Sequence, residues 1–219
     1  MTPMPHVIAI DGAAGSGKST LARALAVELG LPYVNTGLMY RAVALKAKRA
    51  SIATDDARAL ANLAVETRFE LDSSVRPPEL TIDGEAPAAG LSTPEVESSV
   101  SAVARHPEVR AVLREVQRGL AAGGGVVEGR DIGTVVAPNA KLKLFLQAHP
   151  DERAGRRALE RDDDRGRIAE ALGTRDELDA RTNPLVPAPD AVVLDTTGLG
   201  AGEVLARALA LARERGIGR

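Results

Sequence analysis

Short apolar runs alternate with longer amphipathic stretches along most of the chain. Residues 7–10 form a short β-branched run before a glycine-rich segment, a pattern typical of a fully buried strand. Between residues 17 and 29, apolar side chains recur three and four positions apart, which predicts a helix that ends at Gly30. The same pattern predicts further strands at residues 33–35, 126–128, 142–146 and 191–195, and further helices at residues 38–49, 55–65, 107–121, 151–161 and 201–215.

This alternation predicts an α/β fold with a doubly wound, five-stranded parallel sheet and helices on both faces. The length of 219 residues suits one domain, residues 1–219, with a small insertion. The pattern changes between residues 67 and 90, where residues 68–71 and 79–85 alternate like short strands around a Pro-Pro turn. We therefore expect a β-rich insert within residues 63–98.

Composition narrows the class of protein. Apolar residues make up 44% of the chain and charged residues 26%, with a net charge of -2, as in ordinary globular proteins. The slight acidic excess and the few aromatic side chains disfavour nucleic acid as a partner. The absence of cysteine excludes disulfides, thiolate metal sites and cysteine nucleophiles. No apolar run approaches the roughly 18 residues that span a bilayer, and residues 1–6 lack signal-peptide features, so we expect a cytoplasmic protein with no membrane partner.

A phosphate-binding motif follows the first predicted strand. Gly12-Ala-Ala-Gly-Ser-Gly-Lys-Ser matches the P-loop pattern, and it opens a predicted helix as that motif requires. At average residue usage such a string arises by chance in about one chain in a hundred. Lys18 is expected to bridge the β- and γ-phosphates of ATP and Ser19 to bind Mg²⁺. The predicted ATP-binding residues of the loop are Gly12, Ala13, Ala14, Gly15, Ser16, Gly17, Lys18, Ser19 and Thr20.

Several classes of protein carry a P-loop. A regulatory GTPase needs an Asn-Lys-x-Asp string, which is absent, and Asp195-Thr-Thr-Gly198 is better interpreted as the end of the last strand than as a switch motif. A motor ATPase needs an apolar strand that ends in Asp-Glu, which is also absent. A kinase needs cations around the migrating phosphoryl group. Arginines near predicted element ends supply them, although each alone is typical of a surface charge: Arg41, Arg110, Arg130, Arg153, Arg156, Arg157, Arg175 and Arg181.

Four strings together carry a family resemblance. They are Val7-Ile-Ala-Ile-Asp-Gly-Ala-Ala-Gly-Ser-Gly-Lys-Ser, Thr36-Gly-Leu-Met-Tyr-Arg41, Glu128-Gly-Arg-Asp-Ile-Gly-Thr134 and Pro184-Leu-Val-Pro-Ala. In this order, and through nearly the whole chain, the sequence resembles the bacterial cytidylate kinases. The resemblance implies an ATP-binding core, a part with the β-rich insert that binds the nucleoside monophosphate (NMP), and an arginine-rich helical lid. The insert falls at residues 63–98, and the charged run at residues 153–167, otherwise typical of a solvated helix face, falls at the lid.

The resemblance also assigns site residues. Thr36, Tyr40 and Arg41 fall where the family binds the monophosphate, and Ser101 and Arg110 where it contacts the cytosine edge. Arg130 is expected to face phosphate, and Asp131 the cytosine or a bound water. Further contacts of CMP are implied at Arg175, Asp179 and Arg181.

The lid and the last third of the chain complete these assignments. Arg153, Arg156 and Arg157 lie at i, i+3 and i+4 and could present guanidinium groups to the ATP phosphates together. The segment between Asp179 and Pro184 is one residue shorter than the family pattern, which puts the place of Arg181 in doubt. The catalytic residues implied are Lys18, Arg130, Arg153, Arg157 and Arg181.

The implied reaction transfers the γ-phosphoryl group of Mg-ATP to CMP or dCMP and yields ADP with CDP or dCDP. ATP and Mg²⁺ are the expected cofactors, and a monomer that acts on small molecules is the expected state. Two alternatives stay open at this point. One is a kinase of the same fold with UMP, AMP or shikimate as acceptor, and the other is a P-loop nucleotide switch.

Overall fold

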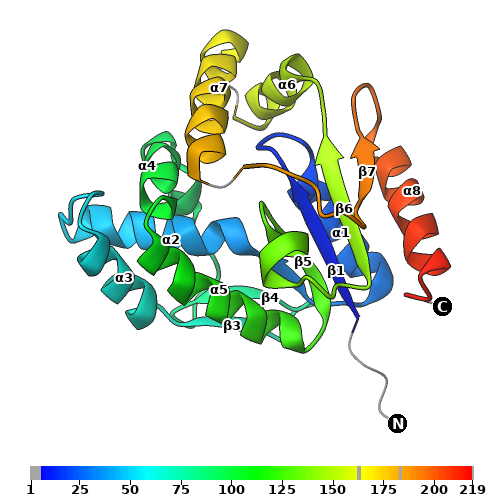
Figure 1. Cartoon of the computed structure of the whole chain (residues 1–219), viewed down its shortest axis with the longest axis horizontal. Coiled ribbons are helices and arrows are strands. Elements are labelled where there is room, and N and C mark those ends of the chain that lie inside the picture. The colour runs from blue at the N-terminus through cyan, green and yellow to red at the C-terminus, as the bar shows by residue number, and fades with distance from the viewer. Residues whose placement is uncertain (1–5, 162–163, 183, 219) are drawn as a thin grey trace.

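The chain folds around one seven-stranded sheet, seen in the computed structural model, which describes residues 6–161, 164–182 and 184–218 (Figure 1). The strand order is β3-β4-β2-β5-β1-β6-β7. The strands are β1 (Val7–Gly12), β2 (Tyr33–Asn35), β3 (Phe69–Asp72), β4 (Glu79–Ile82), β5 (Gly125–Gly129), β6 (Leu142–Gln147) and β7 (Val192–Asp195).

The five strands predicted for the parallel sheet are confirmed. They form the continuous parallel run β2-β5-β1-β6-β7. The two strands of the expected insert are also present, but they extend this same sheet. β4 pairs with β2 in parallel and β3 pairs with β4 in the antiparallel direction, so the sheet has seven strands where the pattern predicted five.

The six predicted helices are confirmed to within two residues at each end. Two helices were not predicted, α4 and α7, and neither was a short π-helix after β5. The helices are α1 (Lys18–Leu29), α2 (Thr36–Arg49), α3 (Ala57–Glu66), α4 (Pro94–Ala104), α5 (Pro107–Ala122), α6 (Pro150–Arg161), α7 (Arg165–Thr182) and α8 (Ala201–Glu214), with a 3₁₀ turn η1 (Ala89–Ser92) and the π-helix η2 (Ile132–Val136).

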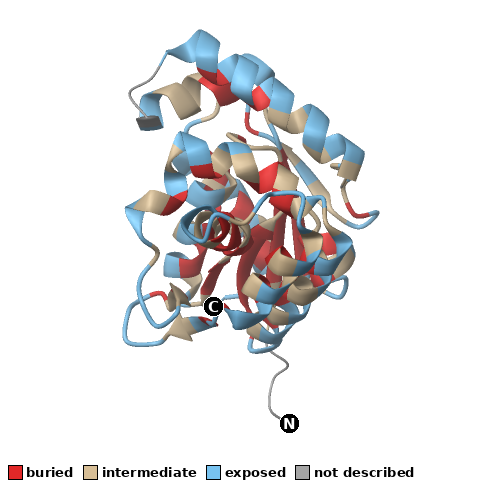
Figure 2. Cartoon of the chain, turned by 90° about the vertical axis from the view of Figure 1, so that its left-hand side faces the viewer, coloured by how far each residue is buried: buried red, intermediate tan, exposed pale blue. Residues whose placement is uncertain are grey.

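The sheet is buried on both faces (Figure 2). On one face Ile8 and Ile10 of β1 pack with α1 and α8, while Ala9, which points the other way, packs with α5 and η2. This division follows from the alternation of side chains along a strand. A further apolar cluster joins α2, α3, α4 and α5 to β3 and β4. Within the described residues no helix is both long and apolar enough to cross a membrane.

The parallel run places five connections at one edge of the sheet. The P-loop follows β1, α2 follows β2, Arg130 follows β5, α6 follows β6 and Thr196 follows β7. Ligands of open α/β sheets bind beyond the carboxyl ends of the strands. The long helices α6 and α7 stand over this edge at the top of Figure 1. The residue range expected for the lid, 153–167, includes most of α6 and the start of α7. Residues 162–163 within it lie outside the described part of the chain.

Candidate active site

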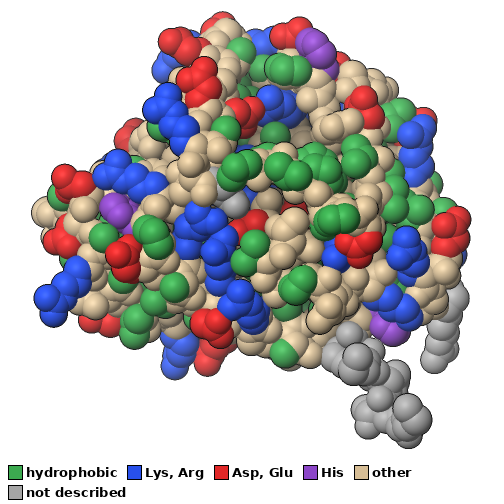
Figure 3. All heavy atoms as spheres, in the orientation of Figure 1, with side chains coloured by type: hydrophobic (Ala, Val, Ile, Leu, Met, Phe, Trp, Pro, Cys, Tyr) green, Lys and Arg blue, Asp and Glu red, His purple; other side chains and the backbone are tan. Residues whose placement is uncertain are grey.

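A cavity of about 1050 Å³ opens at the carboxyl edge of the sheet. It is bounded by α1, α2, α4, α5, α6, α7 and the segment after β5. The surface beneath α6 is visibly hollowed in Figure 3. The volume exceeds that of a typical small-molecule pocket, which suits two ligands side by side.

The P-loop backbone forms one end of this cavity. Gly17 adopts φ 92° and ψ 9° as the N-cap of α1, a left-handed conformation that glycine tolerates without strain. Gly15, at φ +75°, lies so close to α6 that an added Cβ would stand 2.8 Å from the Arg153 carbonyl oxygen. The amides at the start of α1 therefore remain available to an anion. Ala14, Gly15, Lys18, Ser19 and Thr20 line the cavity, whereas Gly12, Ala13, Ser16 and Gly17 form the loop behind it.

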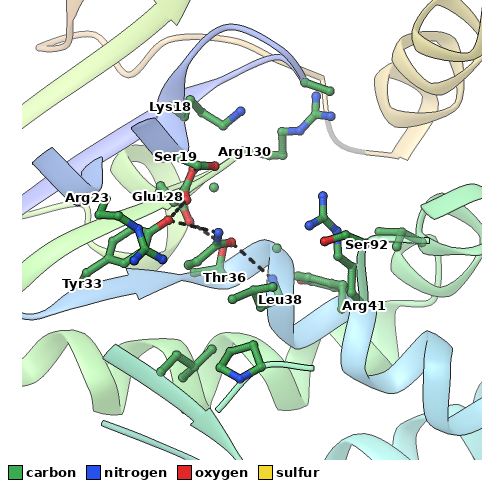
Figure 4. A pocket seen from close by; sticks show the side chains of 18 of the residues that line it. Lys18, Ser19, Arg23, Tyr33, Thr36, Leu38, Arg41, Ser92, Glu128 and Arg130 are labelled. Carbon is green, nitrogen blue, oxygen red and sulfur yellow. Dashed lines mark hydrogen bonds between the residues drawn. The ribbon is translucent and has the colours of Figure 1, made fainter. Parts of the chain in front are cut away.

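The Lys18 ammonium points into the cavity (Figure 4) and donates a hydrogen bond of 2.7 Å to the Ala13 carbonyl. Burial, followed by repulsion from Arg130, lowers the pKa of Lys18 to about 7. An anionic ligand beside Lys18 would remove this penalty, because it would stabilise the charged form.

The Arg130 guanidinium faces Lys18 from the end of β5 (Figure 4). It lies 2.7 Å from the Asp179 carboxylate of α7. Its Nη1 is buried and has no hydrogen-bond partner among the described residues. Burial lowers the pKa of Arg130, and Asp179 opposes that shift. Arg130 is therefore a cation with donor capacity left for a phosphate oxygen.

Glu128, the last carboxylate of β5, is a site residue that the sequence pattern did not identify. It accepts hydrogen bonds from the Ser19 hydroxyl at 2.9 Å and from the Tyr33 hydroxyl at 2.5 Å (Figure 4). Burial, with the Glu128 charge as the next cause, raises the pKa of Tyr33 far above its ordinary value. The position of Glu128 at the end of a buried strand, directly before Gly129-Arg130, was the signal in the sequence that could have identified it as a site residue.

The expected monophosphate residues lie on α2, opposite the P-loop. Thr36 is buried and donates a 2.7 Å hydrogen bond to the Glu128 carbonyl, which ties the start of α2 to β5. Arg41 points into the cavity toward the same space as Lys18 and Arg130 (Figure 4). Tyr40 also lines the cavity, and burial with the nearby Asp131 carboxylate raises its pKa to about 12.

The two residues expected to contact the base, Ser101 and Arg110, both form hydrogen bonds to the end of α7. The Ser101 hydroxyl of α4 donates a 2.8 Å hydrogen bond to Asp179 of α7. Arg175, one turn before Asp179, lies 3.8 Å from the same carboxylate. On the neighbouring helix α5, Arg110 donates to the Thr182 carbonyl at 2.8 Å and lies 3.7 Å from Asp131. All six of these residues line the cavity.

Arg114 of α5 is a second residue that the sequence analysis missed. It lies one turn after Arg110 and forms a short ion pair with Asp131. Its i+4 spacing from Arg110 places both guanidinium groups on one face of α5, and this spacing was the signal available in the sequence.

The three arginines of α6 point to three different partners. Arg153 donates to the Ala14 carbonyl at 3.2 Å and pairs with Asp176 of α7 at 2.7 Å. Arg156 donates to the hydroxyl and carbonyl oxygens of Thr196, at 2.9 and 2.6 Å. Of the three arginines only Arg157 lines the cavity, so the structure does not bring them together at one point.

Arg181 lies on the exposed side of the last turn of α7 and is not among the residues that line the cavity. Arg175 and Asp179 are four residues apart and share one helix face, whereas Arg181 follows Asp179 by two residues and lies about 200° further round the helix. Arg181 therefore lies away from the cavity that its assigned role requires.

No group of three or more histidine, cysteine or acidic side chains that could hold a metal ion occurs within the described residues. The Ser19 hydroxyl donates a hydrogen bond of 2.9 Å to the Glu128 carboxylate beside the P-loop, which places two oxygen donors side by side. Oxygen donors in small number suit Mg²⁺, which keeps several waters and otherwise binds phosphate oxygens.

Comparison with known proteins identifies close relatives over nearly the whole chain. A sequence model of a protein family, described as Cytidylate kinase, matches residues 8–214. The chain is 45% identical over 216 residues to the Cytidylate kinase of Desulfitobacterium hafniense (strain Y51), covering 95% of this chain and 93% of that protein. It is 42% identical over 205 residues to the Cytidylate kinase of Streptomyces griseus, covering 91% and 89% of the two chains.

Solved structures share the fold at low sequence identity. A protein described as uncharacterized, from Eubacterium ventriosum, superimposes with a TM-score of 0.55 at 12% identity and covers 95% of this chain and 98% of its own. A sugar kinase from Janibacter sp. gives a TM-score of 0.50 at 14% identity, with 99% of both chains covered. At this identity the likeness concerns the fold alone.

Proposed function

The chain belongs to the cytidylate kinase family, and on this premise we propose that it transfers the γ-phosphoryl group of Mg-ATP to CMP or dCMP, giving ADP with CDP or dCDP. The observation that carries the proposal is that the P-loop lysine and Arg41 of α2 line one cavity, from opposite ends. ATP at the P-loop and a monophosphate at α2 would then meet inside that cavity.

The reaction needs no general base. The acceptor is an anionic phosphate oxygen at neutral pH, so catalysis depends on in-line positioning and on cations that balance the charge of the transferred group. Lys18 and the amides of the P-loop are assigned to the β- and γ-phosphates, and Arg130 to the region between donor and acceptor. The unpartnered Nη1 of Arg130 supports this role, because a buried donor gains most from an anionic acceptor.

Ser19 and Glu128 are the residues proposed to hold Mg²⁺, either directly or through its waters. When bound, the ion supplies Lewis-acid neutralisation of the phosphate oxygens. The Tyr33 hydroxyl orients Glu128 by donating to its second oxygen.

The base of the acceptor is proposed to lie between α4 and α5. Ser101, Arg110 and Asp131 line that part of the cavity and supply both donors and acceptors. Asp179 is assigned to the acceptor ribose and Arg175 to phosphate. Thr36, Tyr40 and Arg41 complete the monophosphate site.

Closure of the lid on the NMP-binding part is proposed to exclude water, which would otherwise accept the phosphoryl group. Within the lid, Arg157 is assigned to the ATP phosphates, whereas Arg153 and Arg156 already contact the P-loop and Thr196 and are assigned to positioning α6. Arg181 can join the phosphates only if the end of α7 rearranges. We further propose that the protein acts as a cytoplasmic monomer.

The test is the release of ADP in a coupled assay with Mg-ATP and a panel of CMP, dCMP, UMP, AMP, GMP and shikimate. Turnover confined to CMP and dCMP is expected. Activity with another acceptor would keep the kinase reaction and refute the assigned base contacts. ATP turnover that no acceptor changes would refute the phosphotransferase and favour a nucleotide switch.

The metal assignment has its own test. Replacing Glu128 with Gln should raise the Mg²⁺ concentration that gives half-maximal rate by about tenfold, the usual cost of losing an outer-shell carboxylate. Replacing the half-buried Glu79, which pairs with Arg23 at 2.7 Å, with Gln is the matched control and should leave the Mg²⁺ dependence unchanged. Equal Mg²⁺ dependence in both variants would refute the role of Glu128.

A further inference from the structure

Three arginines from three helices converge on the Glu97 carboxylate, in the first turn of α4. Its Oε1 lies 3.1 Å from Arg41 of α2 and forms a short ion pair with Arg157 of α6, and its Oε2 lies 3.9 Å from Arg175 of α7. Only 12% of the Glu97 side chain is exposed. Neither the sequence motifs nor the proposed reaction assigns a role to this carboxylate.

Glu97 lies behind the arginines as seen from the cavity. Arg41, Arg157 and Arg175 all line the cavity, whereas Glu97 is not among the lining residues. A carboxylate that occupied the place of a substrate phosphate would face the cavity itself. Two carboxylates that do line the cavity also contact the arginines, since Glu160 lies 2.7 Å from Arg157 and Asp179 lies 3.8 Å from Arg175.

Electrostatics explains why the cluster needs such a carboxylate. Burial lowers the pKa of Arg41, the charges of Arg175 and Arg157 lower it further, and Glu97 is the largest opposing influence. Without Glu97 three partly buried cations would repel one another and move apart into solvent.

The same carboxylate connects the parts of the protein that meet at the cavity. One turn after Glu97, Ser101 donates to Asp179, so α4 contacts α7 at two successive turns of its helix. The contact with Arg157 extends this connection to α6. A single side chain thus joins the acceptor side of the cavity to the two helices above it.

We propose that Glu97 is a positioning residue for phosphoryl transfer, whose carboxylate holds Arg41, Arg157 and Arg175 in one cluster when α6 and α7 lie closed on α4. Arg41 and Arg157 then act on acceptor and donor phosphates from a fixed separation. This inference rests on the proposed kinase function, which the acceptor panel tests independently.

The test compares Glu97→Gln with Glu95→Gln. Glu95 lies in the same first turn and is exposed, so its variant loses the same interaction with the helix dipole and none of the arginine contacts. For Glu97→Gln we expect kcat/KM for CMP to fall about 10- to 100-fold, as for the loss of a charge-assisted contact. Glu95→Gln should stay within about twofold of the wild type, and thermal melting checks that both variants are folded.

A double-mutant cycle separates positioning from a general effect on stability. In an Arg157→Gln background the further loss caused by Glu97→Gln should be smaller than in the wild type, because one of the three arginine contacts of Glu97 is already gone. In an Arg153→Gln background the full loss should remain, because Arg153 pairs with Asp176 and not with Glu97. Equal losses in both backgrounds would overturn the inference.

Other outcomes decide the remaining cases. A lower KM for CMP in Glu97→Gln would mean that Glu97 competes with the phosphate, which overturns positioning. If Glu97→Gln does not fold, Glu97→Asp retains the charge but withdraws the carboxylate by one methylene, and about tenfold loss is expected; unchanged activity would overturn the inference. A wild-type protein inactive with every acceptor would refute the proposed function instead.

Discussion

Nucleotide binding should be coupled to the protonation of Lys18. The pKa of Lys18 is lowered to about 7 by burial and by Arg130, and phosphate oxygens beside the ammonium should return it toward its ordinary value. Lys18 must therefore take up a proton when ATP binds above neutral pH. Replacing Lys18 with Met keeps an unbranched side chain, one heavy atom shorter, and removes the titrating group.

The magnitude follows from the fraction of Lys18 that is protonated before binding. If the complex keeps Lys18 charged, the Kd for Mg-ATP should rise about 50-fold between about pH 7 and about pH 9, and binding near pH 8 should take up about 0.9 proton. Lys18→Met should bind more weakly at neutral pH but lose most of this dependence. Ionisation of the nucleotide itself is common to both proteins and cancels in their ratio.

The assay is isothermal titration calorimetry without acceptor, in buffers of different ionisation enthalpy, so that the buffer dependence of the heat gives the number of protons taken up. A wild-type Kd that is flat from about pH 7 to about pH 9, or equal proton uptake in Lys18→Met, would refute the reasoning. Stability gives a second readout. Because the folded state binds Lys18's proton more weakly than the unfolded state, the free energy of unfolding without nucleotide should rise with pH between about 7 and 10.5.

Three substitutions test other parts of the site. In Gly15→Ala the added Cβ would meet the Arg153 carbonyl at 2.8 Å, so the free energy of unfolding should fall by about 1–3 kcal/mol. The control Gly30→Ala, whose Cβ meets nothing within 4 Å, should lose less. Equal losses in urea denaturation would contradict the clash. Ser101→Ala removes the hydrogen bond to α7 and should raise KM for CMP by up to about tenfold while KM for ATP stays constant; a shift in both would point to a general loss of structure. Arg114→Met removes the short ion pair with Asp131 and should also raise KM for CMP by about tenfold; an unchanged KM would mean that Arg110 suffices.

The sequence by itself determined the positions of the strands along the chain, of the helices other than α4 and α7, and of the phosphate-binding loop. These features depend on local signals, because the period of apolar positions and the P-loop glycines each lie within one segment. The same local signals failed for α7. That helix is rich in charge and buries only Ile168 and Leu172 among its described apolar side chains, so its apolar pattern is weak.

Residue spacing predicted which side chains share a face of a helix, but it did not predict which groups those side chains contact. Arg153, Arg156 and Arg157 lie together on α6 by spacing, yet the structure directs them to the P-loop and α7, to Thr196 and to Glu97. Which partner each long side chain reaches depends on the elements packed against α6.

Only the tertiary structure decided which distant side chains share the cavity. Ser19 meets Glu128 across 109 residues of sequence, and Ser101 meets Asp179 across 78. The pairing of strands and the docking of α4 against α7 create these contacts, and neither is encoded in the periodicity of any one segment. The chemistry of the phosphate-binding loop could therefore be predicted from sequence. The carboxylates that orient the Ser19 hydroxyl and the arginines of the cavity, Glu128 and Glu97, became apparent only when the elements were packed together.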